Sequence, residues 1–324
     1  MKVLGWVLVG VGVIAGVLTL DPAVVGLSEI TPVLQAVALR GLLAIGAGVV
    51  GLVPVLVSLP LRRTAGKGRR LLVLGVVALL VAAGHVGVLM ERGTSAGEPF
   101  AVAPDGAIDV LTVNTLGARG GVDGLVAMID ELEPDVVALQ ETPAEHAAQV
   151  AAEVAGEYRV FTATTGPQPV QATALLVSAG LGEYRQREAP ATTFGGVWVS
   201  PVEGAGPELL SVHPVPPVPG NVSTWRAELA AITGLCARVD GVVLAGDFNA
   251  TVDHAALRDS GCVDGSVDTG GHATWPASRS PLLGTPIDHV LMDPGAWQPV
   301  ASRVLDAPAA GDHRAVLVRI VPAA

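Results

Sequence analysis

The sequence predicts an α/β sandwich, with two packed β-sheets covered by helices, preceded by three transmembrane helices. Three long apolar segments occupy the chain before residue 92, and short β-branched runs dominate after residue 107. Helical patterns separate only some of these runs, which suits two sheets rather than one regular alternation. We therefore expect a membrane domain at 1–92, a linker rich in Gly, Pro and Ala at 93–106, and a second domain at 107–322.

The apolar segments span residues 3–20, 41–61 and 71–90. Each is long enough for a helix to cross a bilayer core of about 30 Å. None has the polar face that a core helix of a soluble domain needs. The first segment could also be a cleaved signal peptide, with Lys2 as its basic residue. It is longer than a usual signal-peptide core and no small-residue cleavage site follows, so a retained helix is favoured.

Charged residues predict the orientation of these helices. The loop between the second and third segments contains five basic residues: Arg62, Arg63, Lys67, Arg69 and Arg70. The loop after the first segment has Asp21 and Glu29 and no basic residue before Arg40. Because short basic loops stay in the cytoplasm, we expect a multi-pass protein of the cell membrane with a cytoplasmic amino terminus and an extracellular second domain.

Periodicity predicts the elements of the second domain in order. Strands are expected at 108–114, 135–140, 158–163, 172–178, 195–200, 208–213, 242–246, 287–292, 301–305 and 315–321. Helices are expected at 121–133, 144–155 and 223–238, the last with Ser223 or Thr224 as its N-cap.

The second domain is acidic. From residue 93 onward, 11 arginines and no lysine oppose 27 acidic residues, a formal charge of −16. Proteins that bind nucleic acid normally present a basic face, so this balance disfavours DNA or RNA as a partner. Cys236 and Cys262 both lie in this domain, and the sequence leaves open whether they form a disulfide or remain two free thiols.

Six short motifs place polar residues at the ends of apolar runs, where a side chain emerges into a cleft. In chain order they are Leu-Thr-Val-Asn114, Leu-Gln-Glu141-Thr, Ser-Val-His213-Pro, Gly-Asp247-Phe-Asn249-Ala, Ile-Asp288-His-Val and Gly-Asp312-His313-Arg. Hydrolysis of a phosphate ester needs a divalent cation, a base that activates water, and donors to the developing negative charge. Carboxylates, an amide and imidazoles at strand ends supply such groups, and hard oxygen ligands suit Mg²⁺.

In order and spacing, these motifs resemble the endonuclease/exonuclease/phosphatase superfamily, the metal-dependent phosphoesterases related to DNase I. The resemblance covers about residues 107–320 and implies a DNase I-like sandwich. It also implies a site for Mg²⁺ (or Mn²⁺) in which Glu141 is the main ligand, Asn114 lies near the metal, and Asp312 completes the site directly or through water.

The same resemblance implies the catalytic roles. Asp247 would orient or deprotonate the attacking water, and Asn249, two residues along an extended segment and so on the same side, would hold a phosphate oxygen. His213 would donate to the phosphate or the leaving group. His313 would contact the phosphate, while Asp288 would hold the His313 imidazole in one tautomer. His289 is interpreted as a packing residue.

One departure separates this chain from the nuclease members, which have a further carboxylate near the strand at 171–176. That carboxylate pairs with the upstream histidine, and no acidic residue is found there in this chain. Three membrane helices followed by such a domain resemble an actinobacterial group that includes membrane proteins linked to teicoplanin-type glycopeptide resistance. This resemblance implies a phosphatase for a lipid-linked (undecaprenyl) pyrophosphate or other lipid phosphate, with the phospholipid bilayer as a partner. A membrane-anchored extracellular endonuclease and a non-catalytic membrane module remain as alternatives, and the oligomeric state stays open.

Overall fold

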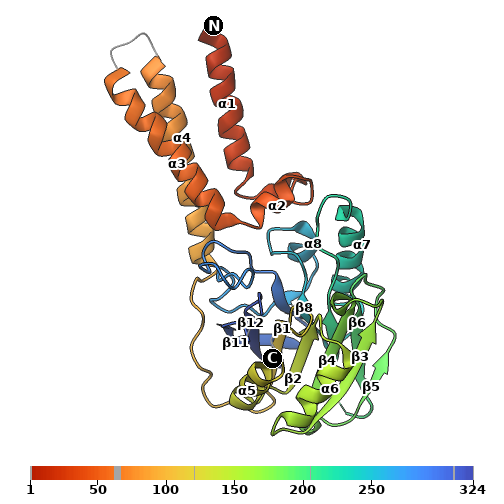
Figure 1. The fold of residues 1–324 in the computed structure, drawn as a ribbon. Coiled ribbons are helices and arrows are strands. Elements are labelled where there is room, and N and C mark those ends of the chain that lie inside the picture. Colours follow the sequence, from red (N-terminus) through yellow and green to blue (C-terminus); the bar gives the residue numbers. More distant parts are fainter. Residues whose placement is uncertain (1, 62–66, 120, 205, 309–310, 324) are drawn as a thin grey trace. The chain divides into compact units, whose positions relative to one another are not determined.

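The computed structural model describes residues 2–61, 67–119, 121–204, 206–308 and 311–323 (Figure 1). The chain divides into two compact units, Met1–Arg92 and Gly93–Ala324. Arg62 and Arg63, on which the predicted orientation partly rests, lie outside the described residues. The segment predicted as a linker has no helix or strand, and its backbone bonds to the second unit, for example from the Val304 N–H to the Ala96 carbonyl at 2.8 Å.

The first unit is helical, and two of its helices are long and apolar enough to cross a membrane. Its elements are α1 (Lys2–Leu18), the 3₁₀ turn η1 (Pro22–Val25), α2 (Val33–Val37), α3 (Arg40–Leu61) and α4 (Lys67–Glu91). The candidate spans are Arg40–Leu61 and Gly68–Glu91. Of the three predicted segments, two thus form helices of membrane-spanning length and composition among the described residues. Helix α1 has 17 residues, about 26 Å at 1.5 Å per residue, because the chain turns at Thr19 ahead of Pro22.

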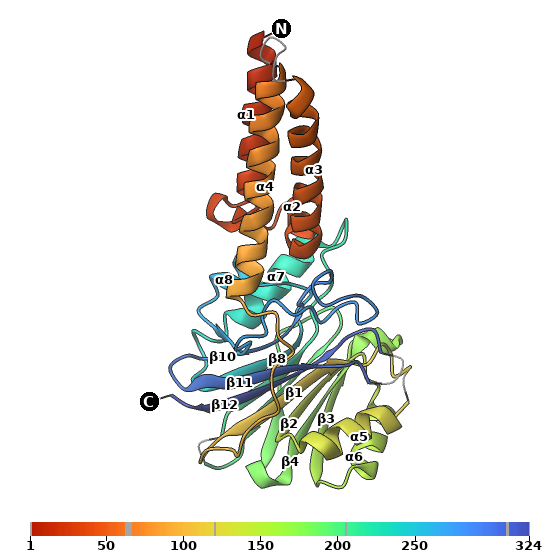
Figure 2. The ribbon, with the colours of Figure 1, turned by 90° about the vertical axis from the view of Figure 1, so that its left-hand side faces the viewer.

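Glycines let α3 and α4 pack backbone against backbone. A Cβ atom added to Gly51 would lie 2.8 Å from the Gly75 carbonyl oxygen, and one added to Gly75 would lie 2.6 Å from the Gly51 carbonyl oxygen. The two helices run side by side (Figure 2). Such small-residue contacts are typical of helix pairs in membranes.

A polar cluster links the end of α1 to α3 and α4. The Arg40 guanidinium donates to the Leu20 carbonyl at 2.9 Å, and its Nη1 lies 3.2 Å from Nδ1 of His85. The other ring nitrogen of His85 lies 3.0 Å from the Thr19 hydroxyl. Arg40 and His85 are both buried, so the residues directly after α1 form part of the packing of this unit.

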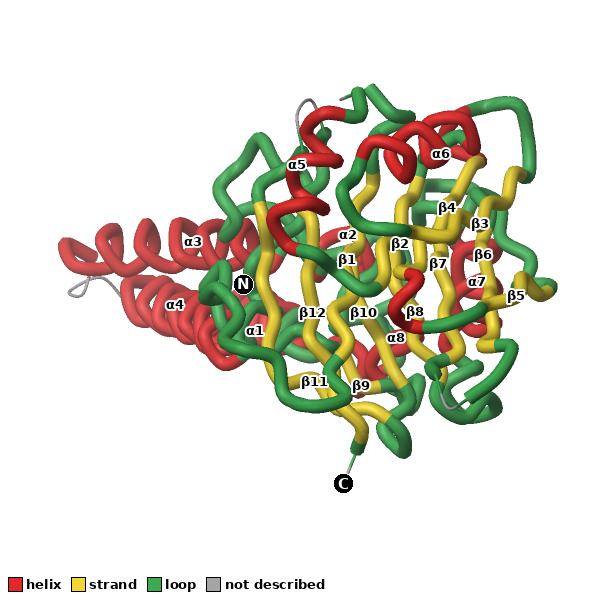
Figure 3. The backbone as a smooth tube through the Cα atoms, turned by 90° about the horizontal axis from the view of Figure 1, so that it is seen from below, coloured by secondary structure: helices red, strands yellow, loops and turns green. Residues whose placement is uncertain are grey.

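The second unit is a sandwich of two six-stranded mixed sheets (Figure 3). The first sheet has the order β11 (Trp297–Leu305), β12 (Ala315–Pro322), β1 (Ile108–Asn114), β2 (Val136–Gln140), β4 (Ala172–Ser178) and β3 (Tyr158–Thr164). The second sheet has the order β5 (Tyr184–Arg187), β6 (Gly196–Pro201), β7 (Glu208–Val212), β8 (Val242–Asp247), β10 (Asp288–Met292) and β9 (Val263–Asp264). The predicted α/β sandwich is confirmed.

Side-chain alternation builds two apolar layers from these strands. One face of β1 and β2, including Val110 and Ala138, packs against Val199 and Val243 of the second sheet to form the core between the sheets. The other face of the first sheet packs under α5 (Asp123–Leu132) and α6 (Ala144–Glu153). Helix α7 (Val222–Thr233) connects the parallel strands β7 and β8, as α5 connects β1 and β2. The short helix α8 (Ala255–Arg258) follows β8.

Strand direction brings the predicted site residues to one end of the sandwich. The parallel pairs β1–β2 and β7–β8 all end there. Strands β10 and β12 begin there because they run antiparallel to β8 and β1, with Asp288 opposite Asp247 and Val316 opposite Thr112.

Cys236, just after α7, and Cys262, just before β9, form a disulfide with their Cα atoms 5.4 Å apart. The structure thus answers the question that the sequence left open.

Candidate active site

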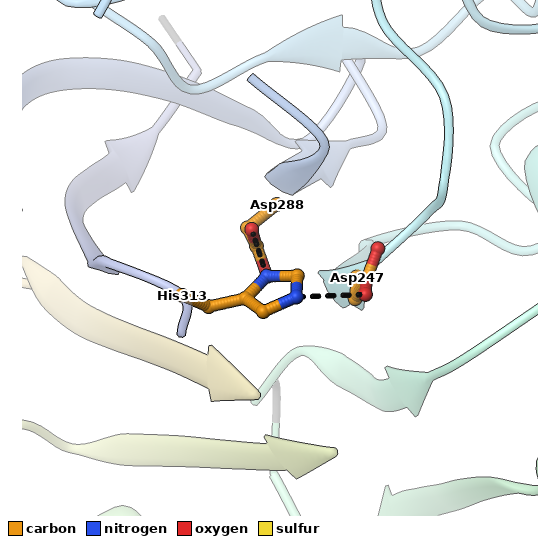
Figure 4. A group of neighbouring side chains, drawn as sticks. All are labelled: Asp247, Asp288 and His313. Carbon is orange, nitrogen blue, oxygen red and sulfur yellow. Dashed lines mark hydrogen bonds and ion pairs between the residues drawn. The ribbon is translucent and has the colours of Figure 1, made fainter. Parts of the chain in front are cut away.

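His313 lies at the centre of the site, between two buried carboxylates (Figure 4). Its Nδ1 is 2.9 Å from an oxygen of Asp288, and its Nε2 is 3.7 Å from Oδ2 of Asp247. Asp288 begins β10 and Asp247 ends β8, so the register of two neighbouring strands sets the carboxylates on either side of the ring.

The carboxylates decide the charge of His313. Burial alone would lower the pKa of this imidazole, but the negative charges of Asp288 and Asp247 outweigh burial and raise the pKa to about 10. For Asp247, burial and the neighbouring Asp288 raise the pKa, although both histidines of the site oppose this. His313 is therefore an imidazolium that is hydrogen-bonded to Asp288 through Nδ1 and forms an ion pair with Asp247 through Nε2.

His213 has very different surroundings, although it lies beside the same carboxylate. Its Nε2 is 3.6 Å from Oδ2 of Asp247, while its buried Nδ1 has no hydrogen-bond partner among the described residues. Burial lowers the pKa of His213 to about 4, so the ring is neutral. The ring of Phe194 packs on it, with centroids 4.9 Å apart. The missing Nδ1 partner agrees with the lack of a carboxylate near β4.

Asn114 bridges the carboxylates of the two sheets. Its amide nitrogen donates to Glu141 at 3.1 Å and to Asp247 at 3.2 Å. Its amide oxygen accepts the Leu116 N–H at 2.9 Å. In this arrangement Asn114 positions the two carboxylates, and the carboxylate oxygens are the groups that can bind a cation.

Glu141 and Asn249 both have left-handed backbones, with φ of 55° and 48°. Such φ values are strained for residues other than glycine and are concentrated at functional sites. Asn249 closes a tight turn, in which its N–H donates to Oδ1 of Asp247 at 2.8 Å. Its amide nitrogen donates to the Pro214 carbonyl at 3.0 Å, which connects this turn to the segment that follows His213.

Asp312 lies at the rim of the site next to Trp275. The Trp275 indole N–H donates to Oδ2 of Asp312 at 3.1 Å, and its ring centroid is 6.5 Å from that of His313. Trp275 remains 38% exposed. The loop around it is fixed by Arg314, whose guanidinium donates to the carbonyls of Ala273, Ala277 and Arg279.

The charges of the site fit a divalent cation. Four carboxylates surround one imidazolium, and burial and then the nearby Asp247 and Asp312 raise the pKa of Glu141 despite its hydrogen bond from Asn114. Buried oxygens of Asp288 and Asp312 have no hydrogen-bond partner among the described residues. Candidate ligand atoms of Asp247, Asp288 and His313 lie within 4.8 Å of one another. A hard cation would offset this concentration of negative charge.

The structure thus brings the eight predicted residues together in one network, linked by the contacts of Asn114, Asp247 and His313. Sequence reasoning missed Phe194, which lies in a loop. His289, interpreted from the sequence as a packing residue, is buried, and its Nδ1 lies 2.6 Å from Asp264 while its Nε2 lies 3.0 Å from the Ala250 carbonyl.

The second unit combines a mixed two-sheet sandwich with carboxylates and histidines gathered at one end. The chain belongs to the endonuclease/exonuclease/phosphatase family, whose model matches residues 111–313. Members of this family are hydrolases that act on phosphate esters and generally use divalent metal ions. None of the curated proteins compared with the chain matches it in sequence.

Several solved structures share the fold. A humanized D. rerio TDP2 with 14 mutations is 16% identical, with a TM-score of 0.51, over 67% of this chain and 99% of that chain. The AP endonuclease LMAP from Leishmania major is 14% identical, with a TM-score of 0.51, over 72% of this chain and 97% of that chain. The 3' phosphatase NExo from Neisseria, bound to a product DNA hairpin, is 19% identical, with a TM-score of 0.50, over 65% of this chain and 98% of that chain. At these identities the likeness concerns the fold alone.

Proposed function

We propose that this chain is a membrane-anchored phosphatase, dependent on Mg²⁺ or Mn²⁺, that hydrolyses a lipid-linked (undecaprenyl) pyrophosphate at the outer membrane surface. The observation that carries the hydrolytic part is the buried grouping of Asp247, Asp288 and His313 next to Glu141. The observation that carries the lipid part is the presence of two apolar helices of membrane-spanning length in the same chain.

In the proposed reaction Glu141 and Asp312 hold the cation, with Asn114 fixing the Glu141 carboxylate. When bound, the cation offsets the negative charge of the phosphate. Asp247 orients a water molecule and accepts its proton as the water oxygen attacks the terminal phosphorus. The bond from that phosphorus to the bridging oxygen breaks, so inorganic phosphate and a lipid monophosphate are released.

The remaining residues stabilise the charge that develops on the phosphate. The His313 imidazolium, held by Asp288, donates to a phosphate oxygen, as does the amide of Asn249. His213, which is neutral because burial lowers its pKa to about 4, donates a neutral hydrogen bond to the phosphate or the leaving oxygen. The two histidines thus contribute differently, one as a cation and one as a neutral donor.

The helical unit supports anchoring in a bilayer. Large apolar side chains on its long helices are exposed, among them Ile45, Val49 and Leu52 on α3 and Leu80 on α4. Lipid would cover such surfaces. The cluster of Thr19, Arg40 and His85 ties the residues after α1 to both long helices, which favours a retained α1 and three crossings.

The proposed extracellular location rests on two features, and the charge of the domain bears on its substrate. The basic loop at 62–70 favours a cytoplasmic position for that end of the helices. Disulfides such as Cys236–Cys262 persist in oxidising compartments. The acidic surface, with a formal charge of −16 from residue 93 onward, would repel a long polyanion yet tolerate one small headgroup whose charge a cation offsets.

The rim of the site offers an apolar surface to a lipid substrate. Trp275 is 38% exposed and Leu282 is 47% exposed, and both belong to the loop that Arg314 fixes. We propose that this loop contacts the isoprenoid chain or the membrane surface while the pyrophosphate lies next to His313.

A substrate panel tests the proposal. The purified full chain in detergent with Mg²⁺ is given undecaprenyl pyrophosphate, a phospholipid, bis-p-nitrophenyl phosphate and plasmid DNA. We expect the fastest release of phosphate from the lipid pyrophosphate, and no release by His313→Ala. Faster cleavage of DNA than of any lipid phosphate would instead favour an anchored nuclease, and no turnover of any substrate would favour a non-catalytic module.

Membrane topology is tested in intact cells. Single cysteines are placed in the 62–70 loop and near Gly93, in a background from which Cys236 and Cys262 have been removed. We expect an impermeant thiol reagent to label only the cysteine near Gly93. The intact mass of the purified protein should include residues 3–20, because α1 is retained. The opposite labelling pattern would place the catalytic domain in the cytosol.

A further inference from the structure

We propose that Glu228, on helix α7, is the residue that positions His213 for catalysis. This inference rests on the proposed phosphoesterase activity. Glu228 lies outside all six sequence motifs, on the helix that connects β7 to β8. The proposal answers a question that the site leaves open, namely how the ring of His213 is held when its Nδ1 has no hydrogen-bond partner among the described residues.

The Glu228 carboxylate binds two loops that flank the His213 ring. One oxygen accepts the Thr193 N–H at 2.8 Å and the Thr193 hydroxyl at 2.5 Å. The other oxygen accepts the Val215 N–H at 2.8 Å. Thr193 directly precedes Phe194, and Val215 follows His213 by two residues. A single side chain therefore fixes the backbone beside each of the two rings that pack together.

Packing against Phe194 thus holds the His213 ring in place of a charged partner at Nδ1. The rings of Phe194 and His213 have centroids 4.9 Å apart and an interplanar angle of 53°. Because Glu228 holds both segments, it sets the distance between the rings and thereby the direction of Nε2, which lies 3.6 Å from Asp247. Among the described residues no side chain bonds to Nδ1, and burial keeps the ring neutral while its position is fixed.

Helix α7 supports the other side of the same segment through Trp225, one turn before Glu228. The Trp225 indole N–H donates to the Asn249 carbonyl at 3.1 Å, and Asn249 donates to the Pro214 carbonyl at 3.0 Å. Residues three apart lie on one helix face. One face of α7 therefore holds Val215 directly through Glu228, and Pro214 indirectly through Trp225 and Asn249.

The burial of Glu228 supports a role beyond packing. A buried carboxylate is costly unless it is fully hydrogen bonded, and Glu228 is only 7% exposed. Glutamine has nearly the same shape but only one oxygen. Glu228→Gln would therefore direct an amide nitrogen at a backbone N–H and break the bridge on one side of the ring pair.

The test is a double-mutant cycle on phosphate release by the full chain in detergent with Mg²⁺. We expect Glu228→Gln to lower kcat by between about 10- and 100-fold with little change in KM, since a displacement of about 1 Å can cost about 100-fold. If Glu228 acts through His213, the same substitution in a His213→Ala background should cost less than about 2-fold further. Multiplying losses, or an unchanged kcat, would overturn the inference.

Two further variants keep the test decisive. Asp293→Asn is the matched control, because that carboxylate also accepts two backbone N–H groups, from Gly241 and Gly295, but at the opposite end of β10. It should keep its kcat. If Glu228→Gln does not fold, Thr193→Val removes only the hydroxyl bond and should lower kcat a few-fold, with no further loss in His213→Ala. An inactive wild-type chain would refute the proposed function itself, whereas an active wild type with an equally active Glu228→Gln would refute this inference alone.

Discussion

The two histidines of the site show two ways to hold an imidazole. His313 is bound through its own nitrogens, with Asp288 at 2.9 Å and Asp247 at 3.7 Å, and these carboxylates keep it charged. His213 is held by what surrounds it, the ring of Phe194 and backbone segments bound to Glu228. The first arrangement fixes charge and direction together. The second fixes direction and leaves the ring neutral.

One carboxylate, that of Asp247, thus lies beside two imidazole donors, one charged and one neutral. Oδ2 of Asp247 lies 3.6 Å from His213 and 3.7 Å from His313. His313 precedes β12 of the first sheet, and His213 follows β7 of the second sheet. A phosphate group next to Asp247 would therefore contact a cationic donor, His313, on one side and a neutral donor, His213, on the other. We expect the cationic side to matter more for activity.

The largest effect is expected for Asp247, which both histidines share. Asp247→Asn keeps the shape of the side chain but removes the base, so kcat should fall by about 100-fold or more. The measurement is phosphate release at saturating substrate. Glu208→Gln, at the opposite end of β7, is the control and should keep wild-type activity. An Asp247→Asn variant within a few-fold of wild type would show that Asp247 is not the base.

A smaller loss is expected for the partner of His313. Asp288→Asn replaces the carboxylate at Nδ1 with an amide, so the imidazolium loses its nearest negative charge. Outer partners of this kind are typically worth about 10- to 100-fold, and kcat should fall in that range. Steady-state kinetics of Asp288→Asn and Glu228→Gln, measured in parallel, would compare the loss of support for His313 with the loss of support for His213. A smaller loss in Asp288→Asn than in Glu228→Gln would mean that the charge of His313 gives it no special weight.

A few-fold loss is expected for the aromatic neighbour of His213. Phe194→Leu keeps an apolar side chain but removes the ring contact, which is worth about 1 kcal/mol, or about 5-fold in rate. Phe161→Leu is the control, because Phe161 packs against the core between the sheets. A loss as large as that of Asp288→Asn would contradict the greater importance of His313, because packing around His213 would then matter as much as the charge of His313.

A third histidine should affect stability and not catalysis. Burial alone would lower the pKa of His289, but the charge and hydrogen bond of Asp264 raise it above 6.5. Burial likewise would raise the pKa of Asp264, but His289 lowers it below 3.8. The contribution of His289 is complete below pH 6.5 and is lost as the pH rises through its folded pKa. That of Asp264 is complete above pH 3.8 and is lost as the pH falls through its folded pKa.

Both contributions are therefore complete between pH 3.8 and pH 6.5. The difference in the free energy of unfolding between wild type and His289→Gln should be largest at pH 5 and smaller at pH 3 and pH 9. Urea unfolding in detergent at the three values measures it, and kcat at pH 7 should change less than about 2-fold. A difference that does not vary with pH would show that the pair is not ionised in the folded protein.

Strands buried on both faces were predictable from the sequence, as were the partly exposed β3 and β6, but the short strands β5 and β9 were not. β1, β2 and β8 appear as apolar runs that lead into site residues, and β12 as an apolar run that follows Asp312 and His313. In β5 only Tyr184 is buried, and β9 has two residues, so neither produces a pattern. β11 begins at Trp297 rather than at 301, because the register shifts between Pro299 and Ala301 and interrupts the alternation.

The site was predictable as far as it lies on strand ends. Asn114, Glu141, Asp247 and Asp288 follow from apolar runs and the pairing of neighbouring strands. Glu228 does not, because it lies 35 residues from Thr193 and 13 from Val215, and only the fold brings them together. The available signal was a charged residue on the buried face of α7, where Trp225, Leu229 and Ile232 are all buried.

Release of phosphate from undecaprenyl pyrophosphate, measured with and without divalent cation, tests the central claim most directly. The full chain in detergent is stripped with EDTA, assayed, and assayed again after addition of Mg²⁺ or Mn²⁺, with Glu141→Gln treated in the same way. If Glu141 holds a catalytic cation, we expect no activity in EDTA, recovery with either cation, and a rate at least about 100-fold lower for Glu141→Gln. Full activity in EDTA, or a Glu141→Gln variant within a few-fold of wild type, would contradict it.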